Sequence, residues 1–314
     1  MKELLTIRHP QKEDAESVCN LVIACDVEDF GAPDFDLNEL LDMWADFDLE
    51  NNVWIVENSQ KTIVGYAFLE EDSEEKLFSY GFVLPSARGT GVGAALLHAI
   101  EDRAKVLCND SGLQKRLQNL IPTLREDANQ LLKNNGFNPV RYFKRMSISM
   151  DQPPKKPLLP EGFSIHPFVK GQDEESVYQT YTESFADHWD YAAPTFDAWV
   201  EKTKRPSFTP EWWFVARDEQ GKVAGIALCR MREDSLFVNQ LGVKSAYRGV
   251  GLGLALLQHS FYASYHSGQP VVSLGVDAES PTGAYRLYEK VGMKAVHDVT
   301  LCEKLIIPAN EKVS

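Results

Sequence analysis

Hydrophobic and polar positions follow the same order in both halves of the chain. In the first half the run "WIVENSQKTIVGYAFL" passes Gly65 and leads to "RGTGVG"; in the second half "WFVARDEQGKVAGIALC" passes Gly225 and leads to "RGVGLG". Gly65 lies 26 residues before Gly91, Gly225 lies 26 residues before Gly251, and the copies close on "NNGF" and "KVGM". Ordered landmarks at matching intervals indicate an internal repeat. We therefore predict two copies of one domain, offset by 160 residues.

The periodicity within each copy predicts the order helix, helix, strand, hairpin, strand, helix, strand, helix, strand. In the second copy "EWWFVARD" and "KVAGIALCRM" are β-rich runs joined by the hairpin signal "EQG", and "SLFVNQLGV" is a strand that enters a glycine-rich turn. Leu252, Leu256 and Tyr262 mark one face of the next helix, and "PVVSLGV" is typical of a buried central strand. The last helix, "PTGAYRLYEKVG", opens with proline and closes with a capping glycine. The predicted fold class is α/β (α+β), a mixed sheet with helices on both faces.

A proline-rich segment separates the copies. "DQPPKKPLLPEG" at 151–162 contains four prolines, which exclude a helix or a central strand and favour a semi-rigid linker. The predicted organisation is thus a domain at 1–150, a linker at 151–162 and a second domain at 163–314.

The composition narrows the class of protein. Of 314 residues, 44% are hydrophobic and 25% charged, as in soluble globular proteins. No apolar run reaches the ~20 residues of a membrane span, and the start lacks the apolar core of a secretory signal. Five scattered cysteines without a C-x-x-C motif suit reduced thiols rather than disulfides or a metal site. We therefore expect a cytoplasmic protein with no membrane partner and no metal.

The net charge of −14 argues against a nucleic-acid partner, because phosphate backbones require a basic face. Residues 1–150 hold 15 Lys and Arg against 25 Asp and Glu, and residues 151–314 hold 17 against 21. Ten acids and no Lys or Arg lie between 26 and 50. Two interpretations stay open for that segment: a solvated surface, or an attractor for a cationic ligand.

The glycine-rich turns place a flexible, open backbone at the start of a helix. Unpaired N–H groups and a partial positive charge at such a position form a seat for a diphosphate, to which Arg248 or Arg88 adds a formal charge. Neither turn has the Lys-Ser/Thr pair of a P-loop, and 254–276 lacks the acid expected of a dinucleotide fold. A phosphate-bearing ligand is the functional interpretation; a tight strand–helix connection is the structural one.

The turns resemble the cofactor signature Q/R-x-x-G-x-G/A of the GNAT (GCN5-related) N-acetyltransferases. The matches are "RGVGLG" (Arg248, Gly249, Val250, Gly251, Leu252 and Gly253) and "RGTGVG" (Arg88, Gly89, Thr90, Gly91, Val92 and Gly93). "AYRLYEKVGM" is similar to the family's closing A-x-x-L-Y-x-x-x-G-F helix, with Met293 in place of Phe. The duplicated arrangement is most similar to the tandem GNAT proteins that include mycothiol synthase.

This resemblance implies two GNAT domains, each with a mixed, mostly antiparallel sheet, and acetyl-CoA as the cofactor on the turn. It also implies that the strand before the turn splays from its neighbour, so that Leu241, Gly242 and Val243 hold the pantetheine arm and an N–H near Leu241 binds the oxyanion. Tyr288 matches the family's tyrosine and would be the general acid, unless it serves only to pack its helix. The first copy has Leu132 there, so we predict that its domain is catalytically degenerate and that the second is catalytic.

The general base is less well defined by the sequence. An ammonium with a pKa near 10.4 must lose a proton before it attacks, which requires a carboxylate or a water relay. The strand before the turn carries Asn239 where related sequences often carry an acid. Glu233 and Asp234, which begin that strand, are the candidates, with Asp277 after the next strand as a third. His188 in "SFADHWDY" is a candidate wall of the acceptor pocket or an ordinary structural histidine.

The predicted function is N-acetyl transfer from acetyl-CoA to a primary amine of a small molecule or peptide. The acidic balance favours a cationic acceptor. The alternative is a non-catalytic CoA-binding, sensing or protein-interaction module, a function that Tyr288 opposes and Leu132 favours. Two copies in one chain allow either a monomer with an internal pseudo-dimer or a homodimer.

Overall fold

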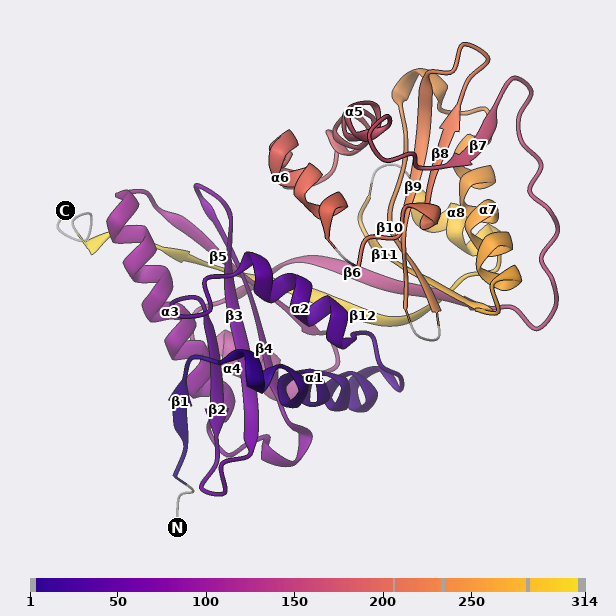
Figure 1. Ribbon diagram of the computed structural model, residues 1–314. Coiled ribbons are helices and arrows are strands. Elements are labelled where there is room, and N and C mark those ends of the chain that lie inside the picture. Colours follow the sequence, from indigo (N-terminus) through magenta and orange to yellow (C-terminus); the bar gives the residue numbers. More distant parts are fainter. Residues whose placement is uncertain (1–3, 206, 233–234, 281–282, 310–314) are drawn as a thin grey trace. The chain divides into compact units, whose positions relative to one another are not determined.

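A computed structural model describes residues 4–205, 207–232, 235–280 and 283–309. The chain divides into two compact units (Figure 1). Unit 1 contains Met1–Phe143 and His297–Ser314, and unit 2 contains Lys144–Val296. Each unit is a twisted sheet with helices on both faces, which confirms the predicted fold class.

The sheet of unit 1 has one parallel pair in an otherwise antiparallel arrangement. β4 and β5 pair in parallel, and every other neighbouring pair is antiparallel. The strand order is β1 (Thr6–Arg8), β2 (Val53–Glu57), β3 (Ile63–Ser73), β4 (Lys76–Val83), β5 (Lys115–Pro122) and β12 (Lys294–Ile306).

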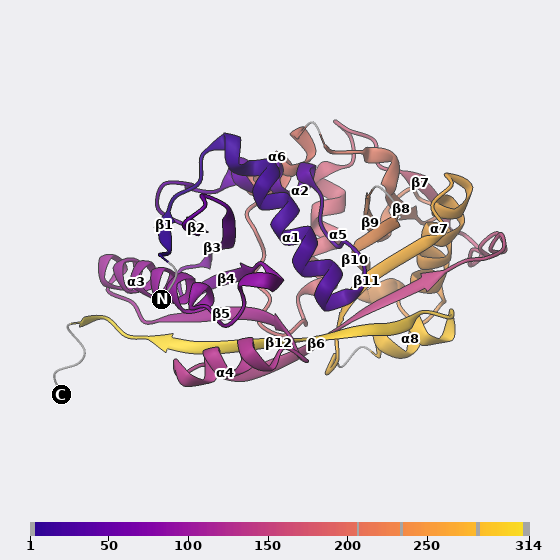
Figure 2. The same cartoon turned by 90° about the horizontal axis from the view of Figure 1, so that it is seen from below.

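Four helices cover this sheet, two on each face (Figure 2). Alternation along β3 explains the layers: Tyr66 and Phe68 pack with α1 and α2, whereas Ala67 and Leu69 pack with α3 and α4. The helices are α1 (Ala15–Phe30), α2 (Leu37–Asp46), α3 (Val92–Ser111) and α4 (Glu126–Asn134), with 3₁₀ turns η1 (Lys12–Asp14) and η2 (Pro85–Ala87).

Unit 2 repeats this plan. β9 alternates in the same way, with Ile226 and Leu228 toward α5 and α6 and Ala227 and Cys229 toward α7 and α8. Its strand order is β6 (Asn138–Ser149), β11 (Val271–Asp277), β10 (Ser235–Val243), β9 (Val223–Met231), β8 (Trp213–Arg217) and β7 (Ser164–Pro167). Its helices are α5 (Glu174–Phe185), α6 (Phe196–Glu201), α7 (Leu252–His266) and α8 (Ala284–Lys290), with 3₁₀ turns η3 (Lys202–Lys204), η4 (Pro210–Trp212) and η5 (Ser245–Tyr247).

The unit boundaries differ from those predicted at 150 and 163, because each copy contributes its last strand across the division. Residues 299–306 of β12 pair antiparallel with β5 of unit 1, and β6 lies beside β11 of unit 2. The predicted linker at 151–162 has no helix or strand, as expected, but belongs to unit 2. A repeat in the sequence locates each strand without revealing which sheet that strand joins.

Candidate active site

The glycine turn of unit 2 leaves open space beside its backbone. Gly249 and Gly251 have φ of 84° and 92°, a left-handed conformation that favours glycine. A methyl group added to either residue would meet no atom within 4 Å. Ala255 donates the first amide bond of α7, to the Gly251 carbonyl at 3.1 Å, so the preceding amides of the helix start have no intrahelical acceptor. This cradle fits a diphosphate group that approaches the main chain closely.

Arg248 fixes this turn to its surroundings. Its Nε donates to the Val243 carbonyl at 3.0 Å and its Nη2 to the Ser184 carbonyl at 3.2 Å, which ties the turn to the end of β10 and to α5. The side chain of Asp187, 3.9 Å away, is exposed. Both hydrogen-bond acceptors are neutral carbonyls, so these two bonds position the turn without pairing the guanidinium with an anion. The sequence predicts the charge that Arg248 adds to the turn, but it does not predict these two hydrogen bonds.

β10 and β11 separate below the turn. They pair in parallel only from Ser235–Val238 and Val271–Leu274, and beyond that point β10 pairs with β9 alone. The splay that the resemblance implies is therefore present, and Leu241, Gly242 and Val243 lie on the separated part of β10. The β9–β10 register shifts between Val238 and Gln240, which makes Asn239 the extra residue of a bulge. Such a bulge re-aims the backbone beside a gap between strands.

Gly242 has a packing role that the sequence did not reveal. A methyl group on this residue would lie 2.7 Å from Ser184 Cβ, closer than carbon atoms can approach. Only glycine lets β10 pass directly against α5 at this level of the sheet.

Tyr288 lies in α8 and is 7% exposed. It belongs to the same core cluster as Val238 and Leu274, the last paired residues before the strands separate. Burial raises the pKa of the Tyr288 phenol to about 12, so the hydroxyl remains protonated at neutral pH. Its placement therefore suits a proton donor and equally a packed core tyrosine.

Aromatic side chains gather after α5. Phe185 packs against His188 with ring centroids 4.5 Å apart and against Tyr181 at 5.3 Å. Burial lowers the pKa of His188, Asp277 raises it and Arg248 lowers it. Two of the charged residues that influence His188 are thus the arginine of the turn and the last residue of β11. The other two predicted bases, Glu233 and Asp234, lie outside the described residues.

Unit 1 contains the same turn in a different electrostatic setting. Gly89 and Gly91 have φ of 76° and 101°, and Arg88 Nε again reaches back to its strand, to the Val83 carbonyl at 3.5 Å. The rest of the guanidinium forms an ion pair with Asp29 at 3.0 Å. Nothing in the local sequence pattern indicates this role of Asp29, because α1 and the turn are 59 residues apart along the chain.

A second arginine completes this cluster. Arg125, just before α4, binds the same Asp29 at 2.8 Å and also Asp127 at 2.8 Å. The carboxylate of Asp29 is only 9% exposed, so unit 1 holds an internal anion against its turn arginine.

Beyond Ser79, where β4 separates from β5, β4 keeps a regular register with β3. β4 and β5 pair from Lys76–Ser79 and Arg116–Asn119, but β4 continues along β3 to Val83 without a bulge. Gly93 and Val92 belong to the predicted cofactor turn of unit 1. A methyl group added to Gly93 would lie 3.3 Å from the side chain of Leu131 in α4. A methyl group added to the equivalent Gly253 of unit 2 would come within 4 Å of Val243 alone, at 3.6 Å. Helix α4 therefore approaches its turn, whereas α8 does not.

Leu132 and Tyr288 occupy equivalent positions. The carbonyl of Leu132 accepts from Phe137 N–H at 3.1 Å, and that of Tyr288 accepts from Met293 N–H at 3.1 Å. Both side chains are buried, at 4% and 7% exposure. The alignment made from the sequence thus corresponds to one structural position with a phenol in unit 2 and an aliphatic group in unit 1.

Within the described ranges, no three His, Cys, Asp or Glu side chains come together in a way that would hold a metal ion. Among the helices that are described, none is sufficiently long and apolar to cross a bilayer.

Comparison with known proteins identifies the family of both units. A model of the "Acetyltransferase (GNAT) family" matches residues 174–293, and one of the "Acetyltransferase (GNAT) domain" matches residues 50–139. A mycothiol acetyltransferase from Catenulispora acidiphila is 31% identical over 238 residues, covering 73% of each chain. A mycothiol acetyltransferase from Streptomyces scabiei is 31% identical over 233 residues, which cover 73% of this chain and 72% of the relative.

Solved structures agree with this result. A GCN5-related N-acetyltransferase from Sphaerobacter thermophilus has a TM-score of 0.80 and 33% identity, covering 97% of this chain and 96% of that one. A tandem GNAT protein from the clavulanic acid biosynthesis pathway shares the fold, with a TM-score of 0.75 at 15% identity over 98% of this chain and 100% of that one. The chain belongs to the GNAT acetyltransferase family, as a tandem-domain acyltransferase.

Proposed function

We propose that unit 2 transfers the acetyl group of acetyl-CoA to a primary amine of a small molecule or peptide. The observation that carries the proposal is the strand separation of β10 and β11, which starts at Val238 and Leu274 in the core cluster of Tyr288 and leads to an open glycine turn. A diphosphate on the turn and a linear arm along the free edge of β10 together describe coenzyme A.

Bound acetyl-CoA supplies the thioester. Amides of the turn at 249–253 hold the diphosphate, and the free edge of β10 at Leu241–Val243 binds the amides of the pantetheine arm. A backbone N–H near Leu241, redirected by the Asn239 bulge, stabilises the carbonyl oxygen as it gains negative charge. As the new N–C bond forms and the C–S bond breaks, Tyr288 gives its proton to the leaving sulfur.

The high pKa of Tyr288 has two consequences. The donor is always protonated at neutral pH, but a phenol of pKa about 12 is a weak acid toward a thiol of pKa about 8.5 in water. The same burial raises the pKa of the thiol, because desolvation disfavours a thiolate as it disfavours a phenolate. Transfer within one buried environment is therefore closer to balanced than the solution values suggest.

The amine must lose a proton, for which we propose two alternatives. Glu233 or Asp234 is the base that the sequence favours. His188 is the second candidate, because partial desolvation lowers its pKa and so favours the neutral ring that can accept a proton. Three single variants distinguish these candidate bases: Glu233→Gln, Asp234→Asn and His188→Gln. Only the variant that lacks the true base should lose the rise of kcat/KM with pH.

For unit 1 we propose a non-catalytic role in binding coenzyme. Leu132 has no proton to donate, β4 lacks the bulge, and Asp29 already neutralises Arg88. The unit keeps the glycine turn and the strand separation, which suffice for a ligand that is bound but not turned over.

The decisive experiment measures thiol release from acetyl-CoA with a panel of amines, together with mass spectrometry of the acceptor. Because curated relatives are named for mycothiol, amines of that class belong first in the panel, followed by aminoglycosides, polyamines and amino-sugar conjugates. We expect amine-dependent release with an acetylated product. Tight binding of acetyl-CoA without product from any amine would favour a sensing module instead.

A further inference from the structure

The two units differ in polarity at the fork, the pair of residues after which the parallel strands of each unit separate. In unit 1 the fork is Ser79 of β4 and Asn119 of β5. In unit 2 it is Val238 of β10 and Leu274 of β11. All four side chains are buried, with residue exposures of 0%, 5%, 3% and 2% in that order. The forks thus occupy the same register position, but one is polar and the other apolar, and no role proposed above depends on this difference.

Hydrogen bonds within the polar fork leave one acceptor open. The Ser79 hydroxyl donates to the Gln118 carbonyl at 2.9 Å, and Nδ2 of Asn119 donates to the Ser79 hydroxyl at 2.9 Å. Oδ1 of Asn119 accepts no hydrogen bond from any residue that the structure describes. A buried amide oxygen without a donor is unfavourable, so this oxygen is suited to a ligand that brings a hydrogen-bond donor.

The open oxygen belongs to the face of the sheet that α3 and α4 cover. Side chains alternate along a strand, and Leu117 and Ile121, two residues to either side of Asn119, are members of the core cluster that contains Leu132. Leu132 is the residue that stands in place of the Tyr288 phenol. On the face where unit 2 presents a phenol and an apolar fork, unit 1 therefore presents an aliphatic side chain and a polar fork.

The position of the fork identifies the part of a ligand that reaches it. Two residues beyond Ser79 on the same strand face, a methyl group added to Gly81 would meet no atom within 4 Å, so the space next to the fork is open. A coenzyme whose diphosphate sits on the turn and whose arm enters the gap between β4 and β5 reaches the fork with the end of that arm. This end is a thiol in free coenzyme A and a thioester in acetyl-CoA. A thiol can donate its S–H to an amide oxygen, whereas a thioester has no hydrogen to donate.

We propose that unit 1 selects free coenzyme A over acetyl-CoA and that the thiol donates a hydrogen bond to Oδ1 of Asn119. The inference rests on the proposed function, in which unit 1 binds coenzyme and unit 2 transfers the acetyl group. Free coenzyme A is the product of that transfer, so unit 1 is a product-binding site and not a second substrate site. The apolar fork of unit 2, Val238 and Leu274, suits the methyl of the acetyl group instead.

Calorimetry of the full-length protein with three ligands, in the absence of an amine, tests this selection. The ligands are coenzyme A, acetyl-CoA and desulfo-coenzyme A, in which hydrogen replaces the thiol. The binding event of unit 1 should favour coenzyme A about threefold to tenfold over each of the others, the scale of one buried hydrogen bond. Gly251→Ala alters only the turn of unit 2, so the event that it weakens belongs to unit 2 and the other to unit 1.

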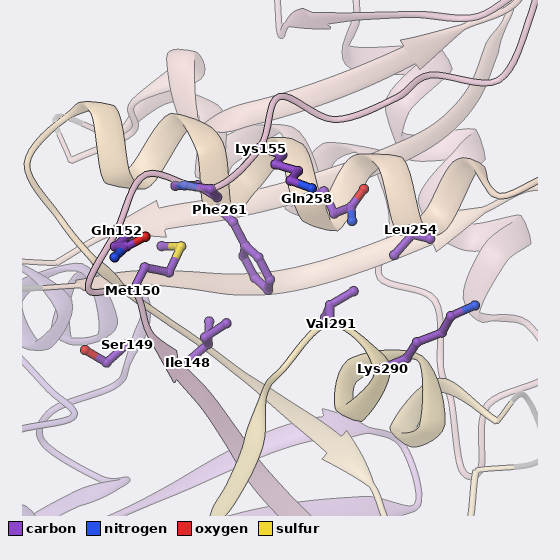
Figure 3. A pocket seen from close by; sticks show the side chains of 11 residues that line it. Ile148, Ser149, Met150, Gln152, Lys155, Leu254, Gln258, Phe261, Lys290 and Val291 are labelled. Atoms are coloured by element: carbon purple, nitrogen blue, oxygen red, sulfur yellow. The ribbon is translucent and has the colours of Figure 1, made fainter.

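Asn119→Leu gives unit 1 the residue that unit 2 has at Leu274. The Ser79 hydroxyl keeps its acceptor, the Gln118 carbonyl, and unit 1 of this variant should bind the three ligands with equal affinity. Gln258→Leu is the matched control, because it also replaces a carboxamide by leucine. Figure 3 shows Gln258 in a cavity of unit 2 whose lining includes no residue of either fork, so this variant should keep the preference.

The outcomes separate this inference from the proposed function. If desulfo-coenzyme A or acetyl-CoA binds unit 1 as tightly as coenzyme A, or if Asn119→Leu keeps the preference, the thiol contact is wrong while acetyl transfer by unit 2 stands. If neither unit binds any of the three ligands, the acetyl-CoA-dependent function itself is wrong. The comparison of ligands in the wild-type protein needs no variant, so a folding defect of Asn119→Leu leaves the test intact.

Discussion

The two units share a backbone and differ in the few groups that chemistry requires. Both have left-handed glycines in the turn, an arginine that reaches back to its strand, and a parallel pair that separates after four residues. They differ at the phenol of Tyr288 against Leu132, at the Asn239 bulge, and at the buried Asp29, which pairs with the turn arginine of unit 1. Binding geometry therefore resides in main-chain conformation, whereas reactivity resides in isolated positions that can be lost without altering the fold.

This difference has a simple physical origin. Glycines with positive φ and strand separation are collective features, because neighbouring elements hold them in place. A side chain such as Tyr288 or Leu132 fills one buried position of similar depth in each unit, so the exchange alters one side chain while the main-chain features stay in place. In the function that we propose, this exchange separates a domain that reacts from a domain that binds.

Removal of the phenol should have the largest effect on this comparison. Tyr288→Phe keeps the ring in the core but removes the proton donor, so kcat should fall about 10²- to 10³-fold while the affinity for acetyl-CoA is retained. Steady-state kinetics of thiol release and calorimetry measure the two quantities. Tyr262→Phe on α7, where the ring stacks on His266 at 4.0 Å, is the matched control and should keep wild-type kcat. Survival of most activity in Tyr288→Phe would leave that tyrosine with a packing role only.

The sequence predicts much of this fold and site because its landmarks are local. Each of these landmarks is contained in a short stretch of the chain: the strand "SLFVNQLGV", the turn after it, and the segments that place Leu132 and Tyr288 at equivalent positions. Strands β1 and β7, of three and four residues, are too short to leave a pattern and were not predicted. The exchange of β6 and β12 was also missed, because a strand's composition does not specify its hydrogen-bonding partner.

Features of the site that the sequence missed depend on contacts between distant residues. Asp29 meets Arg88 and Arg125 across separations of 59 and 96 residues. Gly242 is required by Ser184, which lies on another element. The bulge at Asn239 appears only when the register of β9 and β10 is known. Spacing rules describe single elements, so they cannot report such pairs.

Substitution of equivalent turn glycines should sharpen the comparison. Gly251→Ala and Gly91→Ala each place a side chain at φ near +90° to +100°, which should cost about 1–2 kcal/mol of stability in either unit. Because we propose unit 2 as the catalytic unit, only Gly251→Ala should also raise the KM for acetyl-CoA, by about tenfold or more. Thermal unfolding and kinetics of both variants provide the test. An equal rise of KM in Gly91→Ala would show that unit 1 contributes to turnover.

A third pair of substitutions tests the anion of unit 1. Asp29→Asn removes the shared partner of Arg88 and Arg125, whose side chains are 18% and 20% exposed, and should cost about 2 kcal/mol of unfolding free energy. Asp187→Asn is the counterpart near Arg248; it should cost no more than about 0.5 kcal/mol, because Asp187 is 77% exposed and 3.9 Å away. Urea unfolding of both variants measures the difference. Comparable losses would mean that the two turn arginines have equivalent surroundings.

The smallest expected effect is a pH dependence of stability that arises in α7. Burial lowers the pKa of His259, whose ring packs against Phe214 at 4.7 Å, so the folded chain favours the neutral imidazole. Because the unfolded chain binds a proton below about pH 6.5, stability should fall as pH decreases from 7 toward 5, by at most about 1.4 kcal/mol per pH unit for this group. His259→Gln cannot titrate and should reduce this slope, as measured by urea unfolding at several pH values. His98→Gln, on the exposed face of the corresponding helix α3, should keep the wild-type slope. If both variants keep that slope, the acid sensitivity comes from groups other than the buried histidine, and this difference between the two helices has no energetic consequence.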